Sequence, residues 1–321
     1  MPVPPPDPAF EAVRSPAALE WLRSLGLPDE TVHAITMVAP TWAELRALPA
    51  TQWLSYARIP APTVPHATPP PIPLPADVVR LSRYQMEFPA GLGALRHPPA
   101  LLYCRGVLPQ SPTLGVVCAN YPTEHGSEVV KDAARAAAAA NIVLVLRHGT
   151  TAGRAATLEA VRMGMPVVLV SDVGLDTFDA DSALVDEVVE LGGALVCVAA
   201  PKTTRSQTST AQADMVLVGL STAVLVAQAG LSVSSGVVAL EEAVRERKFL
   251  IVPEPVETGF SAPAAAAAVP MLATPGAYDE QVLGTNADIE RRRSAGMPAA
   301  NAVVTHPQEL AAVLAVALRH M

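Results

Sequence analysis

Residues 211–230 read "AQADMVLVGLSTAVLVAQAG". The segment predicts a polar approach, a short turn at residues 219–221 and then an apolar strand over 223–227. A continuous apolar run of about five residues next to a turn is typical of a strand that is buried on both faces. We therefore expect a sheet, with Ala213-Asp214-Met215 presented at its edge.

The same pattern recurs along the chain and predicts the fold class. Further strand-like runs lie at 114–118, 142–146, 167–170, 194–198 and 249–252. Helical stretches lie between several of them, at 127–139, 155–163, 182–191 and 237–247. Apolar strands that alternate with helices predict an α/β protein, a Rossmann-like parallel sheet covered by helices on both faces.

Three regions are expected. Residues 8–58 carry helical periodicity in four short pieces, which predicts a small all-helical N-terminal domain over 1–59, of the SAM or helix-hairpin-helix kind. Eight of the sixteen residues at 60–75 are Pro, so this segment is predicted to be a linker. Residues 76–321 would form the Rossmann-fold domain, with no C-terminal winged helix.

Composition limits the partners. The formal net charge is -8, so a nucleic acid would find no long-range attraction and would need a local basic patch. Cys104, Cys118 and Cys197 form no CxxC pair, and we expect buried reduced thiols in a cytoplasmic protein. With no signal-like segment and no long apolar run, no membrane partner is expected.

The usual catalytic motifs are missing. There is no G-x-G-x-x-G after the first predicted strand, no Walker A sequence and no G-x-S-x-G, so we expect neither an enzyme nor a cofactor. His125, His148 and His306 lack metal-ligand spacing and are predicted to be structural or surface residues. The carboxylates that follow the third strand are interpreted as a solvated acidic loop; they are Asp172, Asp176, Asp179 and Asp181.

Ligands of such sheets bind outside the carboxyl ends of the strands. There "RHGTTAG", residues 147–153, is either an anion cradle before a helix N-terminus or a plain turn whose Thr caps the helix. In "SVSSG", residues 232–236, we favour a helix cap over a ligand site.

From about Tyr84 onward, an ordered series of segments resembles one known family. They are "RYQMEFPAGLGALRHPPALLYCRGVL", "LEAVRMGMPVVLVSDVGLD", "LGGALVCVAAP", "VGLSTAVLVAQA", "FLIVP" and "LGTNADIERRRSAGMPAANAVVTHPQELAAVL". The order and spacing are similar to those of the DNA-processing protein A (DprA, or Smf) family. The resemblance implies a Rossmann-like domain that binds single-stranded DNA and hands it to the recombinase RecA, in DNA uptake, natural transformation or recombination.

The functional positions depart from the family pattern. Its "R-N-R" before the "GLS" turn, which resembles a phosphate-gripping element, is here Ala213-Asp214-Met215. Its Glu in "VVEA" is Gln228. The change removes two phosphate contacts and adds a repulsive charge, which Lys202 and Arg205 are placed to offset in part.

Three functions follow, of which DNA processing with weakened or altered DNA binding is favoured. The alternatives are a nucleotide-type small-ligand sensor and a non-catalytic interaction protein that self-associates as a homodimer or other homo-oligomer. The predicted DNA- or ligand-binding residues are Asn120, Thr123, Gly126, Arg147, His148, Gly149, Thr151, Lys202, Arg205, Gln228, Ser234, Ser235 and Gly236.

Overall fold

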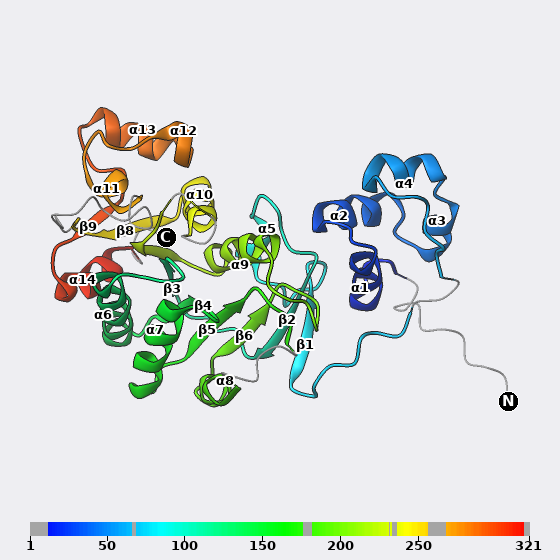
Figure 1. Ribbon diagram of the computed structural model, residues 1–321, viewed down its shortest axis with the longest axis horizontal. Coiled ribbons are helices and arrows are strands. Elements are labelled where there is room, and N and C mark those ends of the chain that lie inside the picture. The colour runs from blue at the N-terminus through cyan, green and yellow to red at the C-terminus, as the bar shows by residue number, and fades with distance from the viewer. Residues whose placement is uncertain are drawn as a thin grey trace.

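A nine-stranded sheet organises the chain (Figure 1). The computed structural model describes residues 12–65, 69–175, 182–230, 232, 236–255 and 268–317. The strand order is β1-β2-β6-β5-β4-β3-β7-β8-β9. Only β2 runs against its two neighbours; the other pairs are parallel. The strands are β1 (Val78–Ser82), β2 (Leu101–Gly106), β3 (Thr113–Cys118), β4 (Val143–Arg147), β5 (Val167–Ser171), β6 (Ala194–Cys197), β7 (Ala223–Gln228), β8 (Phe249–Pro253) and β9 (Ala302–Val304).

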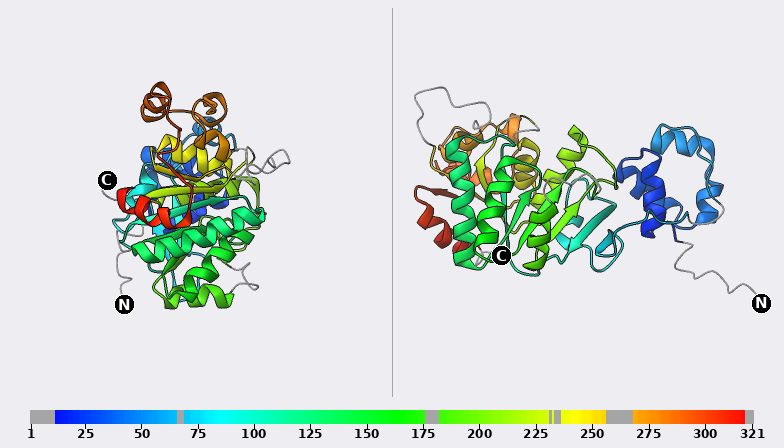
Figure 2. Two further views of the ribbon diagram at one scale, coloured as in Figure 1. Left: turned by 90° about the vertical axis from the view of Figure 1, so that its left-hand side faces the viewer. Right: turned by 60° about the horizontal axis from the view of Figure 1, so that its bottom comes forward.

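Helices cover both faces of this sheet (Figure 2). One core lies under α6 (Glu124–Ala140), α7 (Thr151–Arg162), α8 (Ser182–Glu190) and α14 (Pro307–Ala317). The other lies under α5 (Ala90–Gly93), α9 (Gln207–Gly219), α10 (Val237–Arg245), α11 (Ala268–Ala273), α12 (Glu280–Leu283) and α13 (Ala287–Ser294). Every residue of β4, β5, β6 and β7 is buried, because successive side chains enter opposite cores.

The α/β fold class predicted from the strand pattern is confirmed, and the structure adds detail. The six predicted strands are present, and β1, β2 and β9 extend the sheet. Helix α9 was missed, since apolar residues occur on all its sides and give no amphipathic stripe. The prediction that Ala213-Asp214-Met215 lies at a sheet edge is also wrong. These residues belong to α9, which packs against a face of the sheet, and β7 pairs with a strand on each side.

The predicted N-terminal helical region is present. It holds α1 (Pro16–Ser24), α2 (Asp29–Val38), α3 (Trp42–Ala47) and α4 (Ala50–Ala57), which share their own apolar core (Figure 1). Helix α1 joins this region to the sheet. Arg23 donates to the carbonyl oxygens of Leu101 and Val198, at 3.1 and 2.6 Å.

Glu20 makes the other contact between α1 and the sheet. Its buried carboxylate accepts hydrogen bonds from Arg80 Nε at 2.5 Å and from the Tyr103 hydroxyl at 3.0 Å. Burial and the Glu20 charge both raise the pKa of Tyr103, so the phenol stays a donor at neutral pH.

We expect Glu20→Ala to lower the free energy of unfolding by about 3 kcal/mol, because it leaves Arg80 and Tyr103 with unmet polar groups. Urea unfolding monitored by circular dichroism measures this loss. The exposed Glu187→Ala on α8 is the control and should stay within about 0.5 kcal/mol of the wild type. An equal effect of the two substitutions would contradict the proposed role of Glu20.

Candidate nucleic-acid interface

The loops that follow β3, β4, β5 and β6 meet at the carboxyl edge of the sheet. The N–H of Thr151 donates to the carbonyl oxygen of Asn120 at 3.3 Å, which joins the first two loops. The N–H of Gly174 donates to the carbonyl oxygen of Thr203 at 2.9 Å, which joins the last two. Arg205 donates to the carbonyl oxygen of Gly149 at 3.4 Å and connects the pairs. The edge is thus one continuous polar surface.

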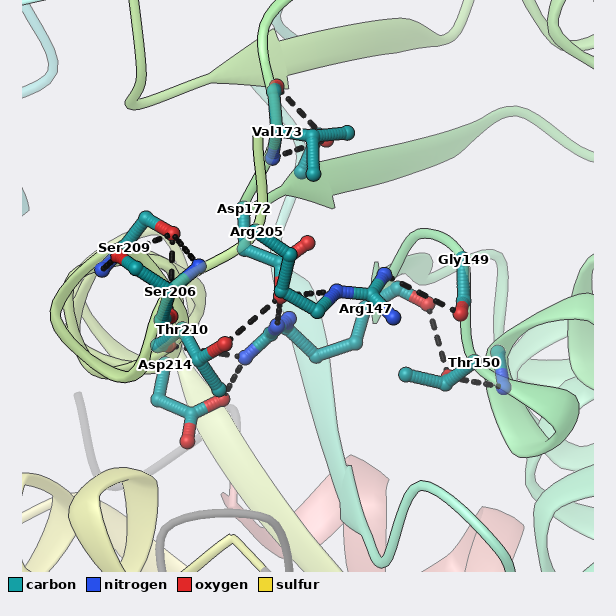
Figure 3. Close-up of polar contacts among 12 residues, drawn as sticks. Arg147, Gly149, Thr150, Asp172, Val173, Arg205, Ser206, Ser209, Thr210 and Asp214 are labelled. Carbon is teal, nitrogen blue, oxygen red and sulfur yellow. Dashed lines mark hydrogen bonds and ion pairs between the residues drawn. The ribbon is translucent and has the colours of Figure 1, made fainter. Parts of the chain in front are cut away.

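Arg147, the last residue of β4, lies beneath this surface in a buried ionic cluster (Figure 3). Its guanidinium donates to Asp214 Oδ1 on α9, to Asp172 Oδ2 at 2.9 Å and to the carbonyl oxygen of Thr210 at 3.0 Å. Arg147 is only 7% exposed, so its charge interacts with groups inside the protein.

Asp172 is the centre of the cluster. A single oxygen, Oδ2, accepts from Arg147, from Arg205 Nε and from the Thr210 hydroxyl, each at 2.9 Å. The cluster therefore contains two carboxylates, of Asp172 and Asp214, and two guanidinium groups, and carries no net charge. Arg147 Nε, Asp172 Oδ1 and Asp214 Oδ2 are buried without a hydrogen-bond partner in the described part of the chain.

Two interpretations of the carboxylates need correction. Asp172 does not lie in a solvated acidic loop, because Arg147 and Arg205 reach it from distant segments and it is 1% exposed. Asp214 is not a charge that repels a ligand, since it is buried and neutralised by Arg147. Asp176, Asp179 and Asp181 lie outside the described residues.

The "RHGTTAG" segment forms a capped turn between β4 and α7. The Thr150 hydroxyl accepts the N–H of Gly153 at 3.0 Å, and a Cβ on Gly153 would lie 1.9 Å from the carbonyl oxygen of Arg147. Gly149 is exposed with φ +71°, whereas His148 is buried. The cap and the contact of Thr151 with the Asn120 loop use amides that an anion cradle would need. This geometry favours the capping alternative.

Gln228 braces the start of α6. Its Oε1 accepts from the backbone N–H and the hydroxyl of Thr123, both at 2.9 Å, and Thr123 caps α6 through the N–H of Gly126. A Cβ on Gly126 would meet Gln228 Oε1 at 2.2 Å, so a larger residue here would displace the Gln228 side chain from Thr123. Thr123, Gly126 and Gln228 thus lie together as predicted, but their contacts are mainly with one another.

The remaining predicted site residues divide into three groups. Lys202 and Arg205 lie at the surface, and Lys202 has a left-handed backbone with φ 66°. Gly236, with φ +84°, precedes α10 and gives no side-chain cap. Ser234 and Ser235 lie outside the described residues.

Sequence reasoning passed over Tyr121, directly after Asn120. Its side chain is 86% exposed at the carboxyl edge. A tyrosine that follows a buried strand and precedes a proline has no core to enter, and that context was the available signal. Tyr121 follows β3, whereas Lys202 and Arg205 follow β6, and Arg205 reaches across to Gly149 after β4. An aromatic ring and two cations therefore lie along this edge.

Other site classes can be checked in the described residues. No cluster of His, Cys, Asp and Glu suited to a metal ion occurs there, and none of the helices described could span a bilayer. The three cysteines are free thiols, and burial raises the pKa of Cys104 to about 11 and of Cys118 to about 12.

The fold and site define a Rossmann-like domain with polar loops at the carboxyl edge of its sheet. A family model described as DNA recombination-mediator protein A matches residues 80–274, which include β2 to β8. The chain belongs to this family. No curated protein gives a significant sequence match.

Solved structures of DNA processing protein A resemble this chain. The Streptococcus pneumoniae protein has a TM-score of 0.63 and 16% identity, with 93% of this chain and 97% of that chain covered. It shares the fold. The Helicobacter pylori protein has a TM-score of 0.47 and 20% identity, with 56% of this chain and 82% of that chain covered.

Burial raises the pKa of Asp214 to about 6 from 3.8, although Arg147 acts in the opposite direction. Between these two values the folded state binds more protons than the unfolded state, so stability falls as the pH rises from about 4 to about 7. Asp214→Asn removes this titration. The wild type should therefore lose stability relative to the variant across that range.

Urea unfolding at pH 4, 5, 6 and 7 measures the difference. Glu187→Gln replaces an exposed carboxylate and should track the wild type at every pH. A constant difference between the wild type and Asp214→Asn would show that Asp214 is ionised throughout.

Proposed function

We propose that this protein is a non-enzymatic DNA-processing protein that binds single-stranded DNA along the carboxyl edge of its sheet. One observation carries the proposal: the match to the family of DNA recombination mediators spans the sheet domain whose loops form this edge. The delivery of the strand to a RecA-type recombinase, as the resemblance implies, belongs to the same proposal.

The chemistry of the edge supports a single strand as the ligand. Proteins that bind single strands without base readout combine cations along the backbone with aromatic rings on which bases stack. Here Lys202 and Arg205 supply the cations and Tyr121 the ring. Arg147 contributes indirectly, because Asp172 binds both arginines and so fixes Arg205.

Binding of this kind should be weaker than the Arg-Asn-Arg pattern would allow. Lys202 makes no ion pair in the described part of the chain, whereas Arg205 shares its charge with Asp172. Few phosphates can be neutralised, and the net charge of -8 opposes approach of the strand. Affinity would then depend on stacking as much as on charge.

The salt dependence of binding tests the charge part of the proposal. Two phosphate contacts to a single strand give a slope of log K against log salt of about -1.4, and Lys202→Gln should reduce it to about -0.7. Fluorescence anisotropy with a labelled oligothymidylate measures the slope. Arg162→Gln, on the far end of α7, is the control and should leave it unchanged. Absence of binding at low salt would refute the proposal.

Stacking gives a second test. Tyr121→Ala should weaken oligonucleotide binding by about 1–3 kcal/mol, whereas Tyr121→Phe keeps the ring and should bind as the wild type does. Tyr56→Ala removes an exposed tyrosine from α4 and serves as the matched control. If Tyr56→Ala and Tyr121→Ala act equally, the carboxyl edge is not the binding surface.

The sensor and interaction alternatives stay predictions. Thr123 and Gln228, two of the residues predicted to bind DNA or a small ligand, already form hydrogen bonds with each other. Thermal stabilisation by a nucleotide that neither Tyr121→Ala nor Arg247→Ala, just before β8, affects would favour the sensor over strand binding.

A further inference from the structure

A basic groove lies at the opposite, amino edge of the sheet. It has a volume of about 830 Å³, and the residues before β7, β8 and β9 contribute to its floor. Its wall includes α13, whose last turn is basic. The residues that matter here are Arg247, Lys248, Phe249, Asp288, Arg291 and Arg292.

The cations of this groove are poorly neutralised. Lys248 is half-buried, and its Nζ donates to the carbonyl oxygen of Ser221 at 2.6 Å. Arg292 is also half-buried and donates to the carbonyl oxygens of Pro298 and Ala300, at 3.0 and 2.6 Å. These acceptors are neutral, and no ion pair to a carboxylate forms at Lys248 or Arg292 among the described residues. Carbonyl oxygens position both cations without cancelling their charge.

The other two cations differ from each other. Arg291 pairs with Asp288, the one carboxylate among the described residues that line the groove. Arg247 is exposed, with a left-handed backbone at φ 55° and no ion pair within the described ranges. The described lining residues therefore give the groove a net charge of about three positive units, in a chain whose net charge is -8.

The pKa of Lys248 also indicates that nearby carboxylates do not fully neutralise its charge. Burial lowers the pKa of Lys248, and the more distant Glu246 and Glu242 offset the effect only in part. A bound anion would supply the missing charge. Guanidinium groups favour phosphate because their N–H donors match its oxygens in pairs.

We propose that the amino-edge groove is a second binding site, which takes the phosphate groups of a nucleotide. Its volume lies in the range of small-ligand sites, and Phe249 offers an apolar wall beside the cations. The nucleotide could be free or part of a strand, and the experiment distinguishes these sources. The proposal does not depend on DNA binding at the carboxyl edge.

Isothermal titration of the full chain with dATP, and with deoxyadenosine as the phosphate-free probe, tests the free source. We expect dATP but not deoxyadenosine to bind. Arg247→Ala should lower the affinity for dATP about fivefold or more. The control is Arg58→Ala, another exposed arginine in a left-handed position after a helix, with φ 54°. It should leave the affinity unchanged. Lys248→Gln keeps a donor for Ser221 and should act as Arg247→Ala does.

The strand source is tested by oligonucleotide anisotropy with the same variants. If dATP does not bind but Arg247→Ala weakens the oligonucleotide and Arg58→Ala does not, the groove binds the phosphates of a strand. The proposal is overturned if neither ligand responds to Arg247→Ala, or if Arg58→Ala has an equal effect. If Lys202→Gln lowers the affinity for dATP instead, the nucleotide binds at the carboxyl edge. That result would also overturn the proposal. Because Arg247 is exposed, its substitution tests the groove even where Lys248→Gln fails to fold.

Discussion

The carboxyl edge depends on one buried guanidinium, that of Arg147, held between Asp172 and Asp214. A charge at this depth is tolerated only with a partner, and the pairing fixes three elements: β4, the end of β5 and the middle of α9. Since Asp172 also binds Arg205, the position of a surface cation depends on the buried cluster. The atoms left without partners make the arrangement a constraint more than a source of stability.

This cluster explains the departure from the family pattern better than a lost phosphate grip does. Asp214 stands where the resemblance places the Asn of Arg-Asn-Arg, and it supplies the second carboxylate that Arg147 requires. Ala213 is fully buried, and Met215 packs against the adjacent core. At these positions the chain has internal pairing and apolar contact where the resemblance implies surface charge. What remains for a ligand is the outer row of Tyr121, Arg205 and Lys202.

The sequence allowed the fold to be predicted because local patterns determine most of it. Apolar runs over β3 to β8 mark a sheet buried on both faces, and the six runs were found without further information. Helix α9 was missed for the opposite reason: it is buried on most sides and lacks periodicity. The candidate site was harder to predict, because Asp172 and Asp214 meet Arg147 only through tertiary contacts, 25 and 67 residues apart in sequence. Charge read in sequence order cannot show such neutralisation.

The two edges of the sheet differ in the groups that contact their cationic side chains. At the carboxyl edge, carboxylates neutralise the buried arginine and half of the surface cations. At the amino edge, carbonyl oxygens hold Lys248 and Arg292 and leave their charge available. β7 has 6 residues, so the edges lie about 20 Å apart, beyond the screening length of about 8 Å in physiological salt. One phosphate group cannot contact both edges, and in a chain with net negative charge each must attract its ligand through its own local geometry.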